Sequence, residues 1–239
     1  MNCDSERLGF IHSGPGIGDK VVYTSLPENY FRNTGRRMID VRRDWVYDHN
    51  PFVQRGVETD QVVDLWRIPL GEPGFPSLAG RICEGFGLAK TFLRHARLYA
   101  FEDVAIDRDA VVVHVTGKSA AASSMPDRVI ERIRESYSGY TIYQIGGADD
   151  KETPFLDRRG LPIWDSIRLI ASSAIFIGVD SGPMNIANCY PRVRKKVVIL
   201  RKMDSCIPVA HPIRWIDYNW EYYNVSDDDN GISMSYLKI

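Results

Sequence analysis

The 239-residue sequence has little cysteine, no long apolar run and almost no net charge. Its four cysteines, Cys3, Cys83, Cys189 and Cys206, are too scattered for a disulfide scaffold, and none forms a C-x-x-C pair. Free thiols in a reducing compartment are therefore expected. Thirty basic and thirty-one acidic side chains leave a net charge of −1. This balance gives no sign of a protein that charge alone holds to nucleic acid, and it leaves local acidic or basic patches open.

The N-terminus lacks the basic start and apolar core of a secretory signal. No uninterrupted apolar stretch has the length of a membrane span. We therefore expect a cytoplasmic protein. Activity at the surface of the inner membrane, on a lipid-linked substrate, is compatible with this expectation. A hydrophobic content of 44% and a charged content of 26% are typical of a globular chain.

The alternation of apolar segments and turns predicts an α/β protein. A strand at residues 8–11 runs into a glycine-rich loop, and a helix follows over about 20–31. An acidic stretch without periodicity, at 102–109, separates this first half from a second series of the same kind. The other expected strands are 38–41, 61–68, 110–115, 140–145, 174–179 and 196–200, and the other expected helices are 78–86, 127–137, 164–172 and 180–189.

Repeated strand–loop–helix units indicate parallel sheets, whose ligands bind at the carboxyl ends of the strands. We expect two α/β halves that face a central cleft. The first covers residues 1–105, and the second covers residues 106–239.

The first candidate site is the glycine loop. Gly14, Gly16 and Gly18 allow a sharp turn and close approach to a ligand, but their spacing is neither a P-loop nor G-x-G-x-x-G. With Asp40 as a ribose-binding acid, the loop is compatible with an NAD-dependent oxidoreductase. Alternatively, the loop has no role in binding, and the glycines only form a tight turn between the strand and the helix. The Asp19 carboxylate would repel a phosphate bound at this loop. We therefore consider two roles for it: a base that faces a second substrate, or a residue at the helix N-terminus that interacts favourably with the helix dipole.

Three polar turns in the second half are candidates for nucleotide binding. In the segment 180–185, backbone N–H groups and the Ser181 hydroxyl can bind a diphosphate, or Asp180 merely caps the helix. Lys118 can neutralise a phosphate or lie on a solvated surface. The carboxylates after Gly146 and Gly147 can bind a ribose diol or form a polar surface turn.

Together these strings resemble glycosyltransferase family nine, the heptosyltransferase-like enzymes. GIGDKVVYTSLPENYF resembles the family's G-D-x-x-x-x-T-P loop, and VVVHVTGKSAAASSMP resembles the opening of its second domain. YQIGGADD resembles its Gly-Gly turn, and GVDSGPMNIAN resembles its D-S-G-P-M-H-L-A signature. The last three strings match in order and spacing over about residues 110–190. The resemblance implies a GT-B fold with two Rossmann-like domains. In that fold the N-terminal domain, residues 1–105, is the acceptor side, and the C-terminal domain, residues 106–239, binds the nucleotide-sugar donor.

The resemblance also implies the roles of individual residues. Asp19 matches the catalytic aspartate, Ser181 and Gly182 match the turn that holds the donor diphosphate, and Asp180 stands where the family contacts the donor sugar. This chain departs from the family at Asn185, where histidine is usual, at Met125, where tryptophan is usual, and at Ser123, where the phosphate-binding lysine is usual. The implied donor site is Thr116, Lys118, Gly146, Gly147, Asp180, Ser181, Gly182, Pro183, Met184 and Asn185, and the implied acceptor-side loop contains Gly16 and Gly18.

The activity implied is inverting glycosyl transfer from a nucleotide-diphosphate-sugar to an acceptor hydroxyl, without metal or cofactor. The expected acceptor is a glycan or glycolipid of a bacterial surface such as lipopolysaccharide, and a nucleic-acid base or a protein stays open. Three rival interpretations remain: a metal-dependent transferase using Asp107 and Asp109, an NAD-binding oxidoreductase, and a non-catalytic nucleotide-sugar-binding protein. The sequence does not indicate an oligomeric state.

Overall fold

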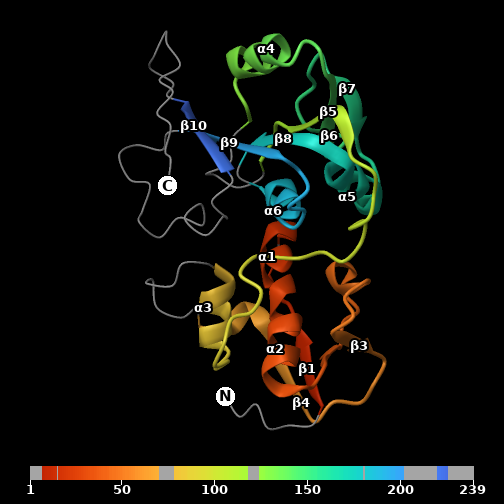
Figure 1. Ribbon diagram of the computed structural model, residues 1–239, viewed down its shortest axis with the longest axis vertical. Coiled ribbons are helices and arrows are strands. Elements are labelled where there is room, and N and C mark those ends of the chain that lie inside the picture. Colours follow the sequence, from red (N-terminus) through yellow and green to blue (C-terminus); the bar gives the residue numbers. More distant parts are fainter. Residues whose placement is uncertain are drawn as a thin grey trace. The chain divides into compact units, whose positions relative to one another are not determined.

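The chain forms two compact α/β units that divide between Ala100 and Phe101. Both sheets are drawn in Figure 1, and all of their strand pairs are parallel. The α/β class and the parallel sheets predicted from the sequence are therefore confirmed. No helix in the part of the chain described has the length and apolarity needed to cross a membrane. The computed structural model describes residues 7–14, 16–69, 78–117, 124–179, 181–201 and 220–225.

The first unit contains a four-stranded sheet in the order β3-β2-β1-β4. Central strand β1 is apolar and buried, whereas edge strand β3 is largely exposed. Short 3₁₀ turns occupy Tyr23–Ser25, Trp45–Tyr47 and Leu65–Arg67. The strands are β1 (Leu8–Ile11), β2 (Met38–Asp40), β3 (Val53–Arg55) and β4 (Gln61–Asp64), and the helices are α1 (Ile17–Val22), α2 (Leu26–Thr34) and α3 (Leu78–Gly85).

Two elements of this unit differ from the sequence prediction. The single helix expected over 20–31 is two helices, because Pro27 has no N–H to donate to the carbonyl of Tyr23. The strand expected over 61–68 ends at Asp64, whose side chain accepts the N–H of Trp66 and starts a 3₁₀ turn. The three-residue strand β3 was not predicted, since so short an exposed segment carries no alternating pattern.

The second unit contains a six-stranded sheet in the order β10-β9-β8-β5-β6-β7. The buried strands β5 and β8 pair at its centre. Helices α5 and α6 pack against each other and against β8. The strands are β5 (Asp107–His114), β6 (Thr141–Gly146), β7 (Leu156–Arg159), β8 (Ser173–Val179), β9 (Lys195–Arg201) and β10 (Trp220–Val225), and the helices are α4 (Asp127–Ser136), α5 (Ile163–Ser172) and α6 (Gly182–Asn188).

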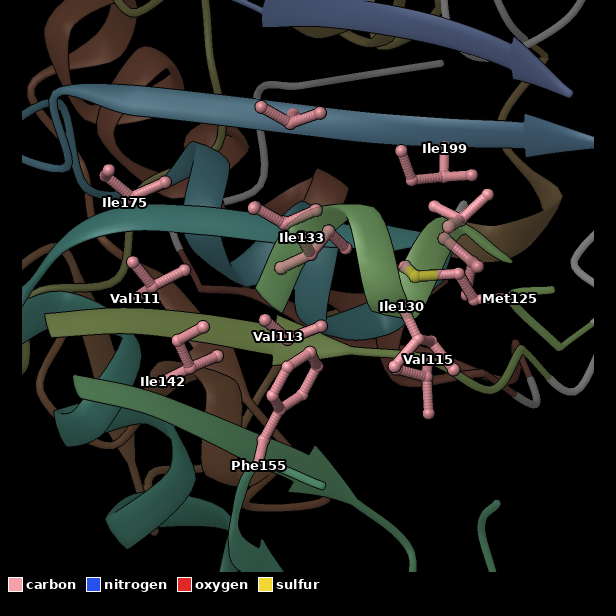
Figure 2. Close-up of a cluster of buried hydrophobic side chains, with 14 of the residues drawn as sticks. Val111, Val113, Val115, Met125, Ile130, Ile133, Ile142, Phe155, Ile175 and Ile199 are labelled. Carbon is pink, nitrogen blue, oxygen red and sulfur yellow. The ribbon is translucent and has the colours of Figure 1, made fainter. Parts of the chain in front are cut away.

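One buried hydrophobic cluster of this unit lies between the sheet and α4. Figure 2 shows Val111 of β5 beside Ile175 of β8, with Val113 of β5 and Ile130 and Ile133 of α4 in the same buried cluster. Successive side chains of a strand point to opposite faces of the sheet. His114 therefore lies on the face away from this cluster.

Sequence reasoning located the central strands of this sheet but not its edges. Strand β7 has the sequence LDRR, which is mostly charged and exposed, so nothing in it signals a strand. The aromatic-rich stretch near residue 220 contains β10, which pairs with β9. Asp107, expected in the connecting stretch, is the first residue of β5.

Candidate functional site

Three of the predicted turns meet at the carboxyl edge of the second sheet. Strands β8, β5 and β6 are neighbours in that order, so the segments that leave their carboxyl ends lie side by side. Ser181 follows β8, Thr116 follows β5, and Gly147 follows β6. Parallel topology therefore brings together residues that are far apart in the sequence. Lys118 and Asp180 lie outside the described residues.

His114, at the end of β5, connects these turns, and the sequence reasoning missed it. Its side chain is only 5% exposed. Nδ1 lies 3.0 Å from Oγ of Ser181, and Nε2 lies 3.8 Å from Oδ2 of Asp150. Burial lowers the pKa of the imidazole to about 4, although the Asp150 carboxylate acts in the opposite direction. The ring is therefore neutral near pH 7.

Asp150 turns back toward the strand that precedes it. Its Oδ2 accepts the backbone N–H of Gly147 at 2.7 Å, and its side chain is 10% exposed. A Cβ at Gly146 would lie 2.2 Å from this oxygen, and the φ of +144° at Gly146 also disfavours a side chain. Gly146, predicted to bind the donor, thus has a structural role: it leaves room for the Asp150 carboxylate.

Helix α6 begins directly after Ser181, which is its N-cap residue. The Ser181 hydroxyl lies 2.9 Å from the carbonyl oxygen of Val179 as well as near His114. Asn185 donates from Nδ2 to the carbonyl oxygen of Ser181 at 3.4 Å. Met184, in contrast, is 1% exposed and belongs to the core. Of the residues predicted in this turn, Ser181, Gly182, Pro183 and Asn185 retain partial exposure.

Thr116 is joined to the same edge. Its Oγ1 accepts the backbone N–H of Lys151 at 3.3 Å. The Lys151 ammonium forms an ion pair with Asp127 at 2.7 Å and donates to the carbonyl oxygen of Met125 at 3.0 Å. These contacts tie the Asp150 turn to the start of α4. Thr116 therefore stands beside the Gly146–Asp150 turn, and its contact with a donor stays a prediction.

In the first unit, Asp19 is the third residue of α1. Its Oδ2 accepts the backbone N–H of Gly16, the N-cap residue, at 3.1 Å. This is one half of a capping box. Asp19 therefore makes the contact expected of a residue at a helix N-terminus. Its catalytic role stays a prediction. Its side chain is partly exposed, and Gly18 lies in the same first turn of the helix.

A second buried histidine precedes this loop. His12 is 4% exposed, and its Nδ1 accepts the N–H of Gly14 at 3.1 Å. Nε2 therefore carries the proton of the neutral ring, and it has no hydrogen-bond partner among the described residues. The rings of Tyr23 and Trp66 lie 5.1 and 5.9 Å from the imidazole. Burial lowers the pKa of His12, while the Asp44 carboxylate opposes the shift.

The Asp40 side chain points toward the backbone of the loop that follows β2. Its carboxylate is 1% exposed and accepts the backbone N–H groups of Arg42 at 3.1 Å and Asp44 at 2.6 Å. Burial raises its pKa, although these hydrogen bonds and Arg55 act against the shift. A ribose diol would have to displace both backbone donors. The geometry therefore disfavours the NAD-binding interpretation.

Solved structures with a similar fold are known, although the sequence itself has no recognised relatives in two comparisons. No protein-family model and no curated protein matches the sequence. The fold is similar to that of a family 9 glycosyl transferase from Veillonella parvula DSM 2008, with a TM-score of 0.68, 13% identity, and coverage of 95% of this chain and 87% of that one. It is also similar to E. coli ADP-heptose LPS heptosyltransferase II, with a TM-score of 0.64, 12% identity, and coverage of 90% and 89%.

A third similar structure is the E. coli heptosyltransferase WaaC with ADP. Its TM-score is 0.62, its identity is 10%, and the match covers 91% of this chain and 93% of that one. At these identities the likeness concerns the fold. The chain therefore has the fold of these glycosyltransferases.

Proposed function

We propose that this protein is a GT-B glycosyltransferase that inverts the anomeric centre and works without a metal. It transfers a sugar from a nucleotide-diphosphate-sugar to an acceptor hydroxyl. The observation that carries the proposal is the meeting of the Ser181, Thr116 and Gly147 turns at one carboxyl edge, around His114. Ligands of parallel α/β sheets bind at this edge. The shared fold with glycosyltransferases supports the same assignment.

In this proposal the second unit binds the donor. The Ser181 hydroxyl and the N–H groups of the turn that opens α6 contact the diphosphate. Thr116 and the Gly146–Gly147 turn line the rest of the nucleotide site. Two of the similar structures are named for ADP-heptose or were solved with ADP, so an ADP-linked sugar is the first donor to test.

The first unit supplies the base. Asp19 accepts the proton of an acceptor hydroxyl, and the oxygen attacks the anomeric carbon of the donor sugar. The bond from that carbon to the diphosphate breaks on the opposite side, and the nucleoside diphosphate leaves with the electron pair. Such a base contributes about 10²–10⁴-fold to the rate. Hydrogen-bond donors around Ser181 stabilise the charge on the leaving group.

The rival metal-dependent transferase finds less support. Asp107 and Asp109 lie at the amino end of β5, whereas His114 and the turns described above lie at its carboxyl end. Oδ1 of Asp107 is also used within the segment, where it accepts the N–H of Asp109 at 3.0 Å. The exposed start of β5 therefore accounts for this pair of carboxylates.

We propose a sugar hydroxyl of a surface glycan or glycolipid as the acceptor.

Calorimetric titration tests the proposal. ADP, UDP, GDP and NADH are each titrated into the protein, and release of ADP from ADP-heptose is then followed with and without added glycan acceptors. Binding of a nucleoside diphosphate, with slow donor hydrolysis or transfer, is the expected result. Binding of NADH alone would favour the oxidoreductase. Donor binding without any turnover would instead identify a nucleotide-sugar-binding protein.

A further inference from the structure

His114 lies between two glycines at the carboxyl edge of the second sheet. In the β5–β8 pairing it stands opposite Gly178, and a Cβ at Gly178 would lie 3.5 Å from Cβ of His114 and 2.9 Å from the ring of Phe176. On its other side, Cδ2 of the ring would lie 3.4 Å from a Cβ at Gly146. Both added Cβ atoms would thus meet His114 at ordinary van der Waals distance, whereas the glycines leave room for its neighbours: Gly178 for the Phe176 ring and Gly146 for the Asp150 carboxylate.

The Ser181 hydroxyl has one proton and two neighbouring acceptors. The carbonyl oxygen of Val179 lies 2.9 Å from Oγ, and Nδ1 of His114 lies 3.0 Å from it. The Asp150 carboxylate, 3.8 Å from Nε2, favours the tautomer that carries its proton on Nε2. In that tautomer Nδ1 is an acceptor. Without a ligand, the Ser181 proton is therefore directed at groups of the protein.

An anion at this edge changes the hydrogen-bond pattern. A phosphate oxygen accepts the Ser181 O–H, so the hydroxyl oxygen then needs a donor from His114. Nδ1 can donate only if it is protonated, and Nε2 keeps its own proton because it faces Asp150. The imidazolium satisfies both neighbours at once. The nearby carboxylate and the bound anion offset its charge.

We propose that His114 is a positioning residue that takes up a proton from solvent when a diphosphate binds, and so turns the Ser181 hydroxyl toward that anion. This inference rests on the proposed function, since the diphosphate is that of the donor. Asp150 is the charged group that acts on the ring among the described residues, and its field favours the protonated form. In the free protein, burial holds the pKa of His114 at about 4, so the ring starts neutral.

The proposal predicts a proton linked to binding. Inorganic pyrophosphate and ADP are titrated into the wild-type protein at pH 6.5 in two buffers that differ in ionisation enthalpy. Phosphates titrate near pH 6 themselves, so the readout is the difference from His114→Asn, whose amide can contact Ser181 but cannot titrate. We expect wild type to take up more protons than His114→Asn. The exposed His49→Asn is the matched control and should behave as wild type.

Ser181→Ala supplies the second arm of this experiment. Pyrophosphate binding should weaken by roughly 10-fold, the loss expected for one hydrogen bond to a charged group. If His114 acts through the hydroxyl, adding His114→Asn to Ser181→Ala should change affinity and proton uptake little further. Additive losses in the double variant would overturn the positioning role.

Nitrogen NMR of the imidazole reads the same step without a mutation in the site. We expect one protonated nitrogen in free His114 and two in the pyrophosphate complex. A neutral ring in a saturated complex overturns this inference but leaves the proposed function standing. If the wild-type protein binds neither pyrophosphate nor ADP, the donor site itself is wrong and both proposals fail.

Discussion

The carboxylate of Asp19 accepts a hydrogen bond from the backbone N–H of Gly16, 3.1 Å away, at the start of α1. The proposed base is thus also a helix-capping group. Its removal has two separable consequences, because asparagine can still accept this hydrogen bond whereas alanine cannot.

Asp19→Asn should therefore lower transfer by about 10²–10⁴-fold, the usual contribution of a general base. Asp19→Ala should lose the same activity and also about 0.5–1.5 kcal/mol of stability with the capping hydrogen bond. Product release from ADP-heptose and urea unfolding measure the two effects. Near wild-type turnover in Asp19→Asn would remove Asp19 from the mechanism.

Asp60 offers a matched control for this experiment. Its Oδ2 accepts the N–H of Arg7 at 3.0 Å, so it is another carboxylate of the first unit with a backbone donor. It precedes β4 and lies at the amino edge of the sheet. Asp60→Asn should leave transfer unchanged.

The buried His114 makes the second unit sensitive to acid. Its pKa is about 4 in the folded protein, against an ordinary value of 6.5. The unfolded chain therefore binds the proton more tightly, and stability falls as the pH is lowered from 6.5 toward 4. The loss should be roughly 2 kcal/mol at pH 5. Hydrogen exchange of the Val111 and Val113 amides at pH 5 and pH 7 measures it.

His114→Asn should make this part of the pH dependence disappear, since the amide does not titrate. The variant starts from a lower stability, so the comparison concerns the slope of the unfolding free energy with pH. Equal slopes in wild type and variant would mean that His114 does not carry the acid sensitivity.

The sequence predicted local features better than side-chain partners. Buried runs such as Val111–Val115 and Ala174–Val179 identify central strands, because strands covered on both faces are continuously apolar. Since parallel strands end at one edge, the turns at Ser181 and Gly146 were expected at a common site. The contact between His114 and Ser181 joins residues 67 positions apart, and no local pattern encodes it. The inward turn of Asp40 was missed for the same reason, because hydrogen bonds to its loop form only in the folded chain.

Asn29 of α2 ties a segment without regular structure to the first unit. Its Oδ1 accepts the N–H groups of Phe92 at 2.7 Å and Leu93 at 2.9 Å, and its Nδ2 donates to the carbonyl oxygens of Ser25 and Leu93, both at 3.0 Å. Asn29→Ala leaves these groups without their partner, at a cost on the order of 1–3 kcal/mol for each group that stays buried. Trypsin should then cleave faster after Lys90.

Asn33 is the comparison residue for this prediction. It holds the same segment through the N–H and carbonyl oxygen of Lys90, at 3.1 and 2.8 Å, but these contacts are exposed. Water can replace the amide there, so Asn33→Ala should accelerate cleavage much less. Equal acceleration in both variants would show that burial of the Asn29 contacts is not what matters.

The stability of the second unit should depend on the cluster between its sheet and α4. Ile177, in the middle of β8, is 2% exposed and belongs to this cluster. Ile177→Ala removes buried methyl and methylene groups and leaves a cavity, so it should cost about 2–5 kcal/mol. Leu156, on edge strand β7, is 52% exposed. Leu156→Ala should change stability by no more than about 0.5 kcal/mol. Urea unfolding of both variants tests the contrast, and a small effect at Ile177 would mean that the sheet and α4 do not enclose a tightly packed core.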